Sequence, residues 1–216
     1  MPEFLKLLRG YDRFRHDGWE AERERWQSLS EGQAPRLLVI ACSDSRVDPA
    51  QIFDVHPGEI FVARNVAALV PPFETTPGHH GVSAALEFAV QFLAVRHVVV
   101  LGHAMCGGCR VALDRSLEGT RPGEGGFVRQ WISMLDDARK PIAETLGTSG
   151  RAAEEAMEHA AIGVSLANLR TFPWVRDKEG TGALKLHGAY FSIADGALHI
   201  LDEATGRFAE SAQTAR

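Results

Sequence analysis

The chain has 216 residues, of which 45% are apolar and 24% charged, and its formal net charge at pH 7 is −5. This length is enough for one domain with a full hydrophobic core. The negative balance argues against nucleic acid as a partner, because phosphate binding needs a basic face, and no apolar run approaches the roughly 20 residues of a membrane span.

The first 31 residues predict an arm of two helices. The first helix is expected over residues 3–16, and a second, mostly polar helix from Trp19 to Leu29. Apolar side chains recur at helical spacing in the first stretch, at Phe4, Leu7, Leu8, Tyr11 and Phe14. This stripe can pack on the core of its own chain or on a partner subunit, and the periodicity leaves both possibilities open.

Strand and helix patterns alternate through the middle of the chain. Buried strands are expected at residues 37–41, 60–64 and 97–102, and a buried helix at residues 83–93. Strands separated by helices indicate an α/β fold with a mainly parallel central β-sheet flanked by helices.

The remainder of the chain predicts helices and a terminal hairpin. The glycine-rich stretch at residues 118–126 is interpreted as a connector, and helices are expected across residues 131–137 and 152–169. Residues 184–193 and 198–202, around Asp195-Gly196, predict a C-terminal β-hairpin. We interpret residues 1–216 as a single domain, with the helical arm at residues 1–31 and a metal-site core at residues 33–113.

Two clusters of metal-ligand residues each follow a predicted buried strand. The segment CSDSR begins at Cys42, and the segment HAMCGG runs from His103 through Cys106 to two glycines. Ligands gather at the carboxyl ends of parallel strands, so these residues can converge if the two strands are neighbours. Two thiolates and one imidazole suit zinc, and three protein ligands leave a fourth position for water or substrate. The sequence therefore predicts one zinc ion in a catalytic rather than a closed structural site.

Other interpretations of the cysteines remain open. Cys106 and Cys109 form a Cys-x-x-Cys, which is a possible redox pair or a rival chelate. That pairing would leave Cys42 and His103 without a function, so we expect Cys109 to be a small apolar filler in the first turn of the next helix. Because two of the three cysteines are then assigned to a metal, no disulfide framework remains, and we expect a cytoplasmic protein.

Asp44 and Arg46 lie two and four residues beyond the first cysteine of the site. They can be an N-cap carboxylate and a surface arginine. Alternatively, the guanidinium keeps the carboxylate ionised and oriented beside the metal. Such a carboxylate could accept a proton from water or occupy the fourth coordination position itself.

Together these motifs resemble those of the β-class carbonic anhydrases. The likeness covers roughly residues 33–113 and includes the segments PGE at Pro57, RNVA at Arg64 and AALEFAV at Ala84. The resemblance implies zinc held by Cys42, His103 and Cys106, with one ion per subunit.

The resemblance also implies roles for the residues around the metal. It assigns Asp44 and Arg46 to catalysis as a dyad. It assigns substrate binding to Gln33, Phe61, Val66, Phe88 and Gly107. From the residues alone, Gln33 would be a solvated loop residue and the aromatic and aliphatic members would be core residues. Many family members have tyrosine where this chain has Phe88, so any hydrogen bond made by that hydroxyl is lost.

Two further positions separate the branches of the family. The branch with allosteric bicarbonate binding has tryptophan where this chain has Val39, and Phe191 aligns loosely with that branch's tyrosine. We therefore expect the plant-like branch, without the bicarbonate switch and with Asp44 free of zinc.

The implied reaction is the reversible hydration of CO2 to bicarbonate and a proton, by attack of zinc-bound hydroxide on CO2. A proton must then leave the site, and His79, His80 and buffer are candidates for carrying it. The alternative, which the sequence favours, is that both histidines are a solvated loop pair. The family further implies a homodimer or a larger homo-oligomer in which the N-terminal helices extend onto a partner subunit, with neither nucleic acid nor a membrane as partner. The alternatives are a carbonyl sulfide or carbon disulfide hydrolase on the same scaffold, or a non-catalytic binding module.

Overall fold

The computed structural model describes residues 2–211, which form two compact units divided between Ala34 and Pro35. Met1 and residues 212–216, at the ends of the predicted 1–216 domain, lie outside the described residues. No helix in the described part of the chain is both long enough and apolar enough to cross a membrane.

The N-terminal unit is helical, as the periodicity predicts. Helix α1 (Pro2–Arg13) continues through a π-helical turn, η1 (Phe14–Gly18), into the short α2 (Trp19–Ala21), and α3 (Arg23–Ser30) follows a bend at Glu22. The continuous helical stretch made of α1, η1 and α2 thus extends beyond residue 16, where the first helix was predicted to end. None of the described α1 side chains is buried, and 70% of Leu7 is exposed. The predicted apolar stripe is therefore real, and this unit by itself does not cover it.

The second unit is built on one six-stranded sheet with the order β2-β1-β3-β4-β5-β6. Its strands are β1 (Leu37–Cys42), β2 (Ile60–Asn65), β3 (His97–His103), β4 (Lys185–Phe191), β5 (Leu198–Asp202) and β6 (Arg207–Glu210). The first four strands in this order are mutually parallel. Strand β5 pairs antiparallel with β4, and β6 pairs antiparallel with β5. These pairings confirm the mainly parallel sheet and the hairpin, now β4 and β5. Strand β6 was not predicted.

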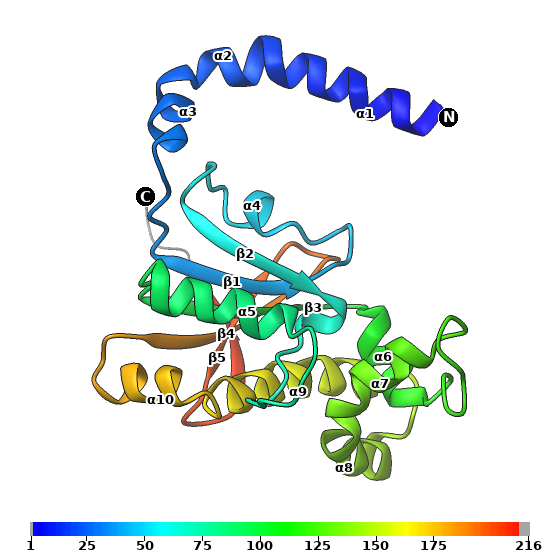
Figure 1. The fold of residues 1–216 in the computed structure, drawn as a ribbon. Helices are drawn as coiled ribbons and strands as arrows, with labels where there is room; N and C mark the ends of the chain where they lie inside the picture. The colour runs from blue at the N-terminus through cyan, green and yellow to red at the C-terminus, as the bar shows by residue number, and fades with distance from the viewer. Residues whose placement is uncertain (1, 212–216) are drawn as a thin grey trace. The chain divides into compact units, whose positions relative to one another are not determined.

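The helices of this unit connect the strands and cover the sheet (Figure 1). They are α4 (Pro49–Ile52), α5 (Gly81–Glu87), α6 (Gly107–Asp114), α7 (Gly126–Ile132), α8 (Asp136–Leu146), α9 (Arg151–Leu169) and α10 (Pro173–Gly180). Shorter turns complete the list: 3₁₀ turns η2 (Val66–Ala68) and η4 (Ser133–Leu135), and the π-helical turn η3 (Phe88–Phe92). The helix predicted at residues 131–137 is in fact the end of α7, η4 and the start of α8.

Alternate side chains of the central strands enter different cores, as the pleat of a strand requires. Leu38 and Ile40 belong to the larger core, which also contains residues of α5, α9 and α10. Val39 and Ala41 point to the other face, where the partly buried Ile52 of α4 packs. The helices α5, α9 and α10 therefore cover one face of the sheet, and α4 lies against the other (Figure 1).

Two glycines allow α9 to approach the sheet closely. A Cβ at Gly102 of β3 would lie 2.7 Å from Cδ1 of Ile162, and one at Gly188 of β4 would lie 2.9 Å from Cγ2 of the same side chain. Both contacts are shorter than a methyl group tolerates, so the close fit requires glycine at these positions. It holds the middle of α9 over β3 and β4, close to the ends of the strands that carry the metal-ligand residues.

Candidate metal centre

Three ligating side chains converge at the carboxyl ends of two neighbouring strands. Cys42 is the last residue of β1, His103 is the last residue of β3, and Cys106 follows in the next turn. Strands β1 and β3 pair in parallel, with Ala41 opposite Leu101. The ligating atoms of the three residues lie within 4.8 Å of one another, and all three residues are buried. The structure thus brings together the three predicted ligands.

The hydrogen bonding of His103 leaves one ring nitrogen available for a metal. Its Nδ1 lies 2.9 Å from the carbonyl oxygen of Ala104. Because a carbonyl only accepts, Nδ1 carries the proton, and Nε2 presents a lone pair. Nε2 is buried and has no hydrogen-bond partner among the described residues. A buried acceptor without a partner is rare in proteins, and here it faces two thiols.

The two thiols are suited to a soft divalent cation. Their sulfur atoms lie 4.0 Å apart. The hydrogen bond with Cys106, together with burial, raises the pKa of the Cys42 thiol to about 12. The hydrogen bond with Cys109 raises the pKa of the Cys106 thiol to about 12. A cation placed between the sulfurs would favour both thiolates, and the set of two sulfurs and one imidazole nitrogen fits a metal of the zinc type.

Cys109 does not belong to this group. It lies in the first turn of α6, as predicted, and its side chain is buried. The group of potential ligands found in the described residues consists of Cys42, His103 and Cys106. All three cysteines are free thiols. The geometry therefore favours the metal site over the Cys-x-x-Cys pair.

Asp44 and Arg46 form a planar, two-pronged ion pair beside the cluster. Arg46 Nε donates to Oδ1 of Asp44 at 2.9 Å, and Nη2 donates to Oδ2 at 2.8 Å. These hydrogen bonds hold the pKa of the Asp44 carboxyl well below its usual range, so it is ionised at neutral pH. The N-cap of α4 is Asp48, whose side chain accepts from two backbone N–H groups. The interpretation of Asp44 as an N-cap residue is therefore wrong.

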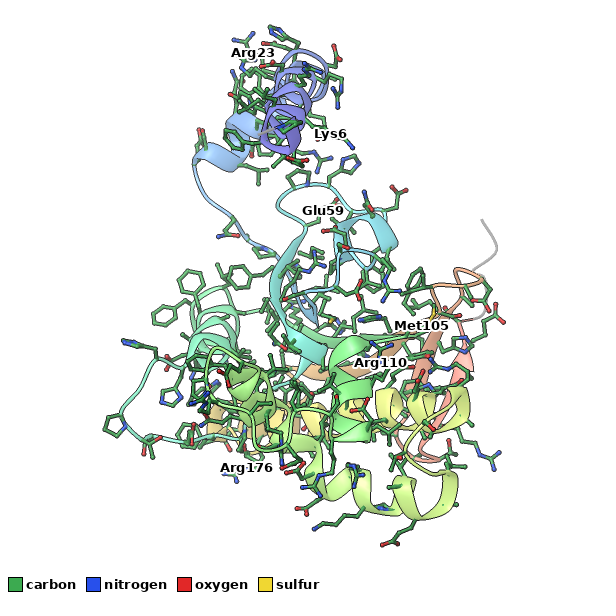
Figure 2. The ribbon with its side chains drawn as sticks, turned by 90° about the vertical axis from the view of Figure 1, so that its right-hand side faces the viewer. Lys6, Arg23, Glu59, Met105, Arg110 and Arg176 are labelled. Atoms are coloured by element: carbon green, nitrogen blue, oxygen red, sulfur yellow. The ribbon has the colours of Figure 1, made fainter. Side chains whose placement is uncertain are left out.

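A polar cavity opens next to this pair. It has a volume of about 400 Å³ and is lined by Asp44, Arg46, Met105, Gly107, Arg110 and Glu154. Met105 and Arg110, both labelled in Figure 2, line the same cavity. A Cβ at Gly107 would meet no other atom within 4 Å. Gly107 thus faces open space, which a small molecule could enter.

Arg64 fixes the loop that carries Cys42 and Asp44. Its guanidinium donates to the carbonyl oxygens of these residues at 2.9 and 2.6 Å and to the Asp48 carboxylate at 3.1 Å. One rigid side chain thus satisfies several acceptors in a short segment. Arg64 begins the RNVA segment of the sequence, and this segment alone predicts no role for it.

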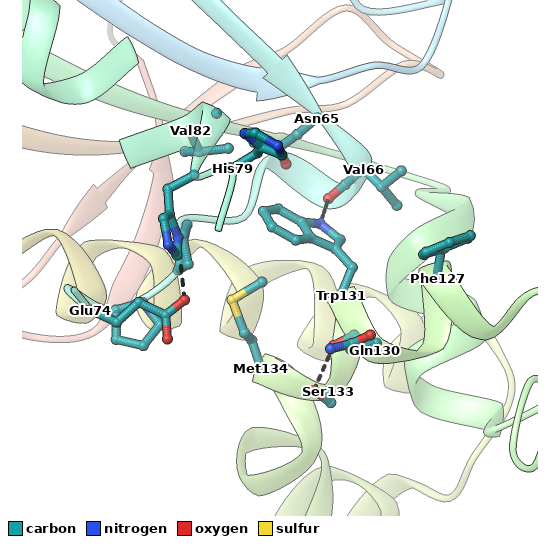
Figure 3. A pocket seen from close by; sticks show the side chains of 14 residues that line it. Asn65, Val66, Glu74, His79, Val82, Phe127, Gln130, Trp131, Ser133 and Met134 are labelled. Carbon is teal, nitrogen blue, oxygen red and sulfur yellow. Dashed lines mark hydrogen bonds and ion pairs between the residues drawn. The ribbon is translucent and has the colours of Figure 1, made fainter. Parts of the chain in front are cut away.

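The predicted substrate residues lie in different places. Val66, on η2, packs beside α6, and its carbonyl oxygen accepts a hydrogen bond of 2.9 Å from Trp131 Nε1 (Figure 3). Phe61 and Phe88 contact each other with ring centroids 5.8 Å apart. Gln33 belongs to the N-terminal unit. Val66 is 37% exposed and Phe88 44% exposed, so their interpretation as core residues is wrong for a single protomer.

A second, larger cavity is bordered by Val66. It has a volume of about 820 Å³, and Val66, Trp131, His79 and His80 are among its lining residues (Figure 3). His80 lies 3.5 Å from a carboxylate oxygen of Glu74. The structure thus places both predicted proton carriers in the lining of a cavity that Val66 also borders.

Sequence reasoning missed Glu158, a carboxylate with only 2% of its surface exposed. It accepts a hydrogen bond from the backbone N–H of Cys106 at 3.1 Å. Its position on α9 is one helical turn before Ile162 and two before Leu166, both buried. An acidic residue in register with an apolar stripe was the signal that could have revealed it.

Comparison with known proteins places this arrangement in a family. The family model described as carbonic anhydrase matches residues 37–198, which contain the whole cluster. The chain belongs to the β-class carbonic anhydrases. Two curated proteins of Arabidopsis thaliana support this assignment. Beta carbonic anhydrase 3 is 33% identical over 194 residues, which cover 88% of this chain and 74% of that protein. Chloroplastic beta carbonic anhydrase 5 is 37% identical over 175 residues, which cover 80% of this chain.

Solved structures of other β-carbonic anhydrases have the same fold. The β-carbonic anhydrase CcaA superposes with a TM-score of 0.89 at 30% identity, covering 100% of this chain and 95% of that one. A tetrameric β-carbonic anhydrase of the ascomycete Sordaria macrospora superposes with a TM-score of 0.82 at 28% identity, covering 98% of this chain and all of that one. The match with the chloroplastic relative spans 56% of that relative's length.

Proposed function

We propose that this protein is a zinc enzyme that catalyses the reversible hydration of CO2 to bicarbonate and a proton. The observation that carries the proposal is the convergence of Cys42, His103 and Cys106 beside the Asp44–Arg46 pair, in a chain of the β-carbonic anhydrase family. The three converging residues would hold one zinc ion per subunit. Zinc, when bound, acts as a Lewis acid that makes water a better nucleophile at neutral pH.

The Asp44–Arg46 pair would orient the attacking water. Asp44 is ionised, and its Oδ1 accepts from both Nε and the backbone N–H of Arg46. Oδ2 accepts only from Nη2 of Arg46, so this oxygen has a lone pair left to accept a hydrogen bond from water. Arg46 also donates to the carbonyl of Met105 at 3.0 Å, which ties the pair to the turn before Cys106. The carboxylate therefore has a fixed direction, as a group that orients water by accepting a hydrogen bond from it requires.

CO2 is small and apolar, and we propose that Phe61, Val66 and Phe88 form its binding surface. The exposure of Val66 and Phe88 in one protomer supports a surface that a second protomer completes. The backbone at Gly107 borders the open space beside the dyad. The amide of Gln33 would donate a hydrogen bond to a substrate oxygen. His79, His80 and buffer remain the proposed carriers of the released proton.

We further propose that the enzyme has no allosteric bicarbonate site. Val39 is buried in the core beside Ala41, and no tryptophan stands at its position. Phe191 lacks the hydroxyl of a tyrosine. Because Arg46 engages both oxygens of Asp44, we also propose that this carboxylate stays off the metal at rest.

The proposed assembly is a homodimer or a larger homo-oligomer. The apolar stripe of α1 and the exposed Phe88 and Phe92 support it, and the related enzyme of Sordaria macrospora is described as tetrameric. We propose that α1 covers apolar surface of a partner subunit. A cytoplasmic location stays a prediction from cysteine usage.

The alternatives gain no support from the comparisons. The relatives and solved structures named above are carbonic anhydrases, and none of their names refers to carbonyl sulfide or carbon disulfide. A non-catalytic module would be expected to lack a complete dyad, whereas Asp44 and Arg46 are both present and paired.

The experiment is stopped-flow CO2 hydration near pH 7 and pH 8.5, with protein of measured zinc content. Thiolates bring more negative charge to a metal than imidazoles do, so we expect the rate to rise with pH. Cys42→Ser should lose both zinc and hydration. Cys109→Ala is the matched control and should keep both, because Cys109 stands outside the ligand group.

Two results would contradict the proposal. Zinc-loaded wild-type protein that hydrates no CO2 at either pH, but hydrolyses carbonyl sulfide, would transfer the activity to that substrate. Loss of zinc in Cys109→Ala with retention in Cys42→Ser would favour the Cys-x-x-Cys chelate.

A further inference from the structure

The carboxylate of Glu158 is buried on α9 and receives four hydrogen bonds. Oε1 accepts from the Cys106 N–H at 3.1 Å and from Nη1 of Arg151 at 3.3 Å. Oε2 accepts from the Tyr190 hydroxyl at 2.8 Å and from Nη2 of Arg151. A carboxylate with 2% exposure is tolerated only with such compensation.

The fold places this carboxylate next to the cluster for a specific reason. Ile162 fits against Gly102 and Gly188, where even a methyl group would collide. Glu158 lies one helical turn earlier and therefore on the same side of α9. It reaches past the end of β3 to the turn that connects His103 with Cys106.

That turn needs support from outside itself. Met105 has a φ of +57°, in the left-handed region that residues other than glycine seldom occupy. Cys106 is the N-cap of α6, so its N–H is not part of the hydrogen bonding within that helix. Glu158 accepts from this N–H, whereas Arg46 donates to the carbonyl of Met105 at 3.0 Å. The single peptide group between Met105 and Cys106 is thus held at both ends.

The two groups that hold this peptide have different roles. Arg46 is part of the proposed catalytic dyad, and Glu158 does not contact the predicted site of reaction. Arg151 and Tyr190 keep the Glu158 carboxylate in place, because Arg151 donates twice and Tyr190 donates from β4. Burial, reinforced by the hydrogen bond to Glu158, raises the pKa of the Tyr190 hydroxyl, so it stays protonated and remains a donor.

We propose that Glu158 is a positioning residue that sets the direction of the Cys106 thiolate toward the metal, by holding the Met105–Cys106 peptide against Arg46. The inference rests on the proposed function, since it takes Cys106 to be a metal ligand. Partners of metal ligands typically change metal affinity by about 10- to 100-fold when they are removed.

The test is Glu158→Gln, with Glu155→Gln as the matched control. Glu155 lies on the same helix and pairs with the same Arg151 at 3.8 Å, but its side chain is 50% exposed. Glutamine at position 158 retains the shape of the side chain, but it presents one NH2 group to a donor and so cannot accept all four hydrogen bonds. We expect zinc affinity, measured by competition with a chelator, to fall about 10- to 100-fold in Glu158→Gln and to be unchanged in Glu155→Gln.

Two spectroscopic measurements separate positioning from loss of stability. In the cobalt-substituted protein, the ligand-field bands should shift in Glu158→Gln and not in Glu155→Gln. In protein labelled with ¹⁵N at its three cysteines, the Cys106 amide proton should resonate downfield in the wild type because it donates to a carboxylate. In Glu158→Gln that signal should move upfield, whereas the Cys42 and Cys109 signals should stay nearly in place.

The outcomes distinguish the two proposals. Wild-type protein that binds no zinc through Cys42 and Cys106 would overturn the proposed function. Normal zinc binding in the wild type, with unchanged affinity and cobalt spectrum in folded Glu158→Gln, would overturn the positioning role alone. If Glu158→Gln does not fold, the wild-type Cys106 amide decides: a proton resonance at an ordinary, unshifted position would refute the contact.

Discussion

The two adjacent glycines at the start of α6 should respond in opposite ways to the same substitution. A Cβ at Gly108 would lie 2.8 Å from Cγ1 of Val66 and 3.1 Å from Cβ of Ala67. A Cβ at Gly107 would have no neighbour within 4 Å. Ala67 has a φ of +64° and belongs to a tight turn, so it cannot yield easily. The comparison of Gly107→Ala with Gly108→Ala therefore separates packing from function.

The expected magnitudes follow from these distances. Overpacking costs about 1–3 kcal/mol, and replacing glycine by alanine within a helix returns about 0.5–1 kcal/mol. Gly108→Ala should thus lower the free energy of unfolding by about 1 kcal/mol, within about 0–2.5 kcal/mol. Gly107→Ala should leave it unchanged or raise it by up to about 1 kcal/mol. Its methyl group would project into the cavity beside Asp44 and Arg46, so kcat/KM for CO2 hydration should fall on the order of tenfold.

The assays are urea unfolding and stopped-flow hydration on both variants at equal zinc content. Val66→Ala removes the closest atom, so it should partly restore the stability of Gly108→Ala, and the two substitutions should be non-additive. Equal stability of the two glycine variants would refute the packing argument. Full activity in Gly107→Ala would refute the placement of substrate beside that residue.

Three more outcomes follow from individual contacts. Trp131→Phe removes the hydrogen bond to the Val66 carbonyl and should lower the free energy of unfolding in urea by about 1 kcal/mol. An unchanged free energy of unfolding would show that water replaces the indole as the donor. Asp44→Asn should abolish most CO2 hydration while the zinc content stays near one per subunit, because the variant loses the negative charge that Arg46 orients. Full activity of this variant would show that the Asp44 carboxylate has no part in the mechanism. Burial lowers the pKa of His159, so the unfolded chain binds its proton more readily, and stability should fall as pH drops below about 6.5. In His159→Phe the free energy of unfolding, measured from urea unfolding curves, should fall less between pH 7 and pH 5. An unchanged difference between the two pH values would contradict this role of His159.

The central strands and the metal-ligand cluster could be predicted from the sequence because both depend on local patterns. Apolar runs such as residues 37–41 can hardly be anything but buried strands, and strand ends in a parallel sheet share one edge. The convergence of Cys42 with His103 required one further assumption, that the two strands are neighbours, and the sheet order bears it out. The N-terminal helices were similarly visible in the spacing of their apolar residues.

The elements that were missed lack such a pattern. Strand β6 is short, and Arg207 and Glu210 give it a polar, exposed edge, so nothing in its sequence predicts a strand. Helix α8 contains Pro141, which argues against a helix when read alone. Glu158 is recognisable in the sequence only as an acidic residue at a spacing typical of buried positions. Two of its four hydrogen bonds come from Arg151 on the same helix, and the other two come from the distant Cys106 and Tyr190. Such a network becomes evident only when the tertiary structure is known.

Helix α9 has a consequence for how the molecule can open. It contacts β3, which ends at His103, and also β4, α6, α8 and η2. Local unfolding in proteins proceeds in cooperative units, and a helix shared by so many neighbours cannot detach alone. The backbone between His103 and Cys106 should therefore rearrange only in the rare states in which α9 has left the sheet, even though the Met105 side chain of this turn is 44% exposed. The proposed metal ligands would then keep their arrangement during motions of the surrounding loops and lose it only when α9 leaves the sheet.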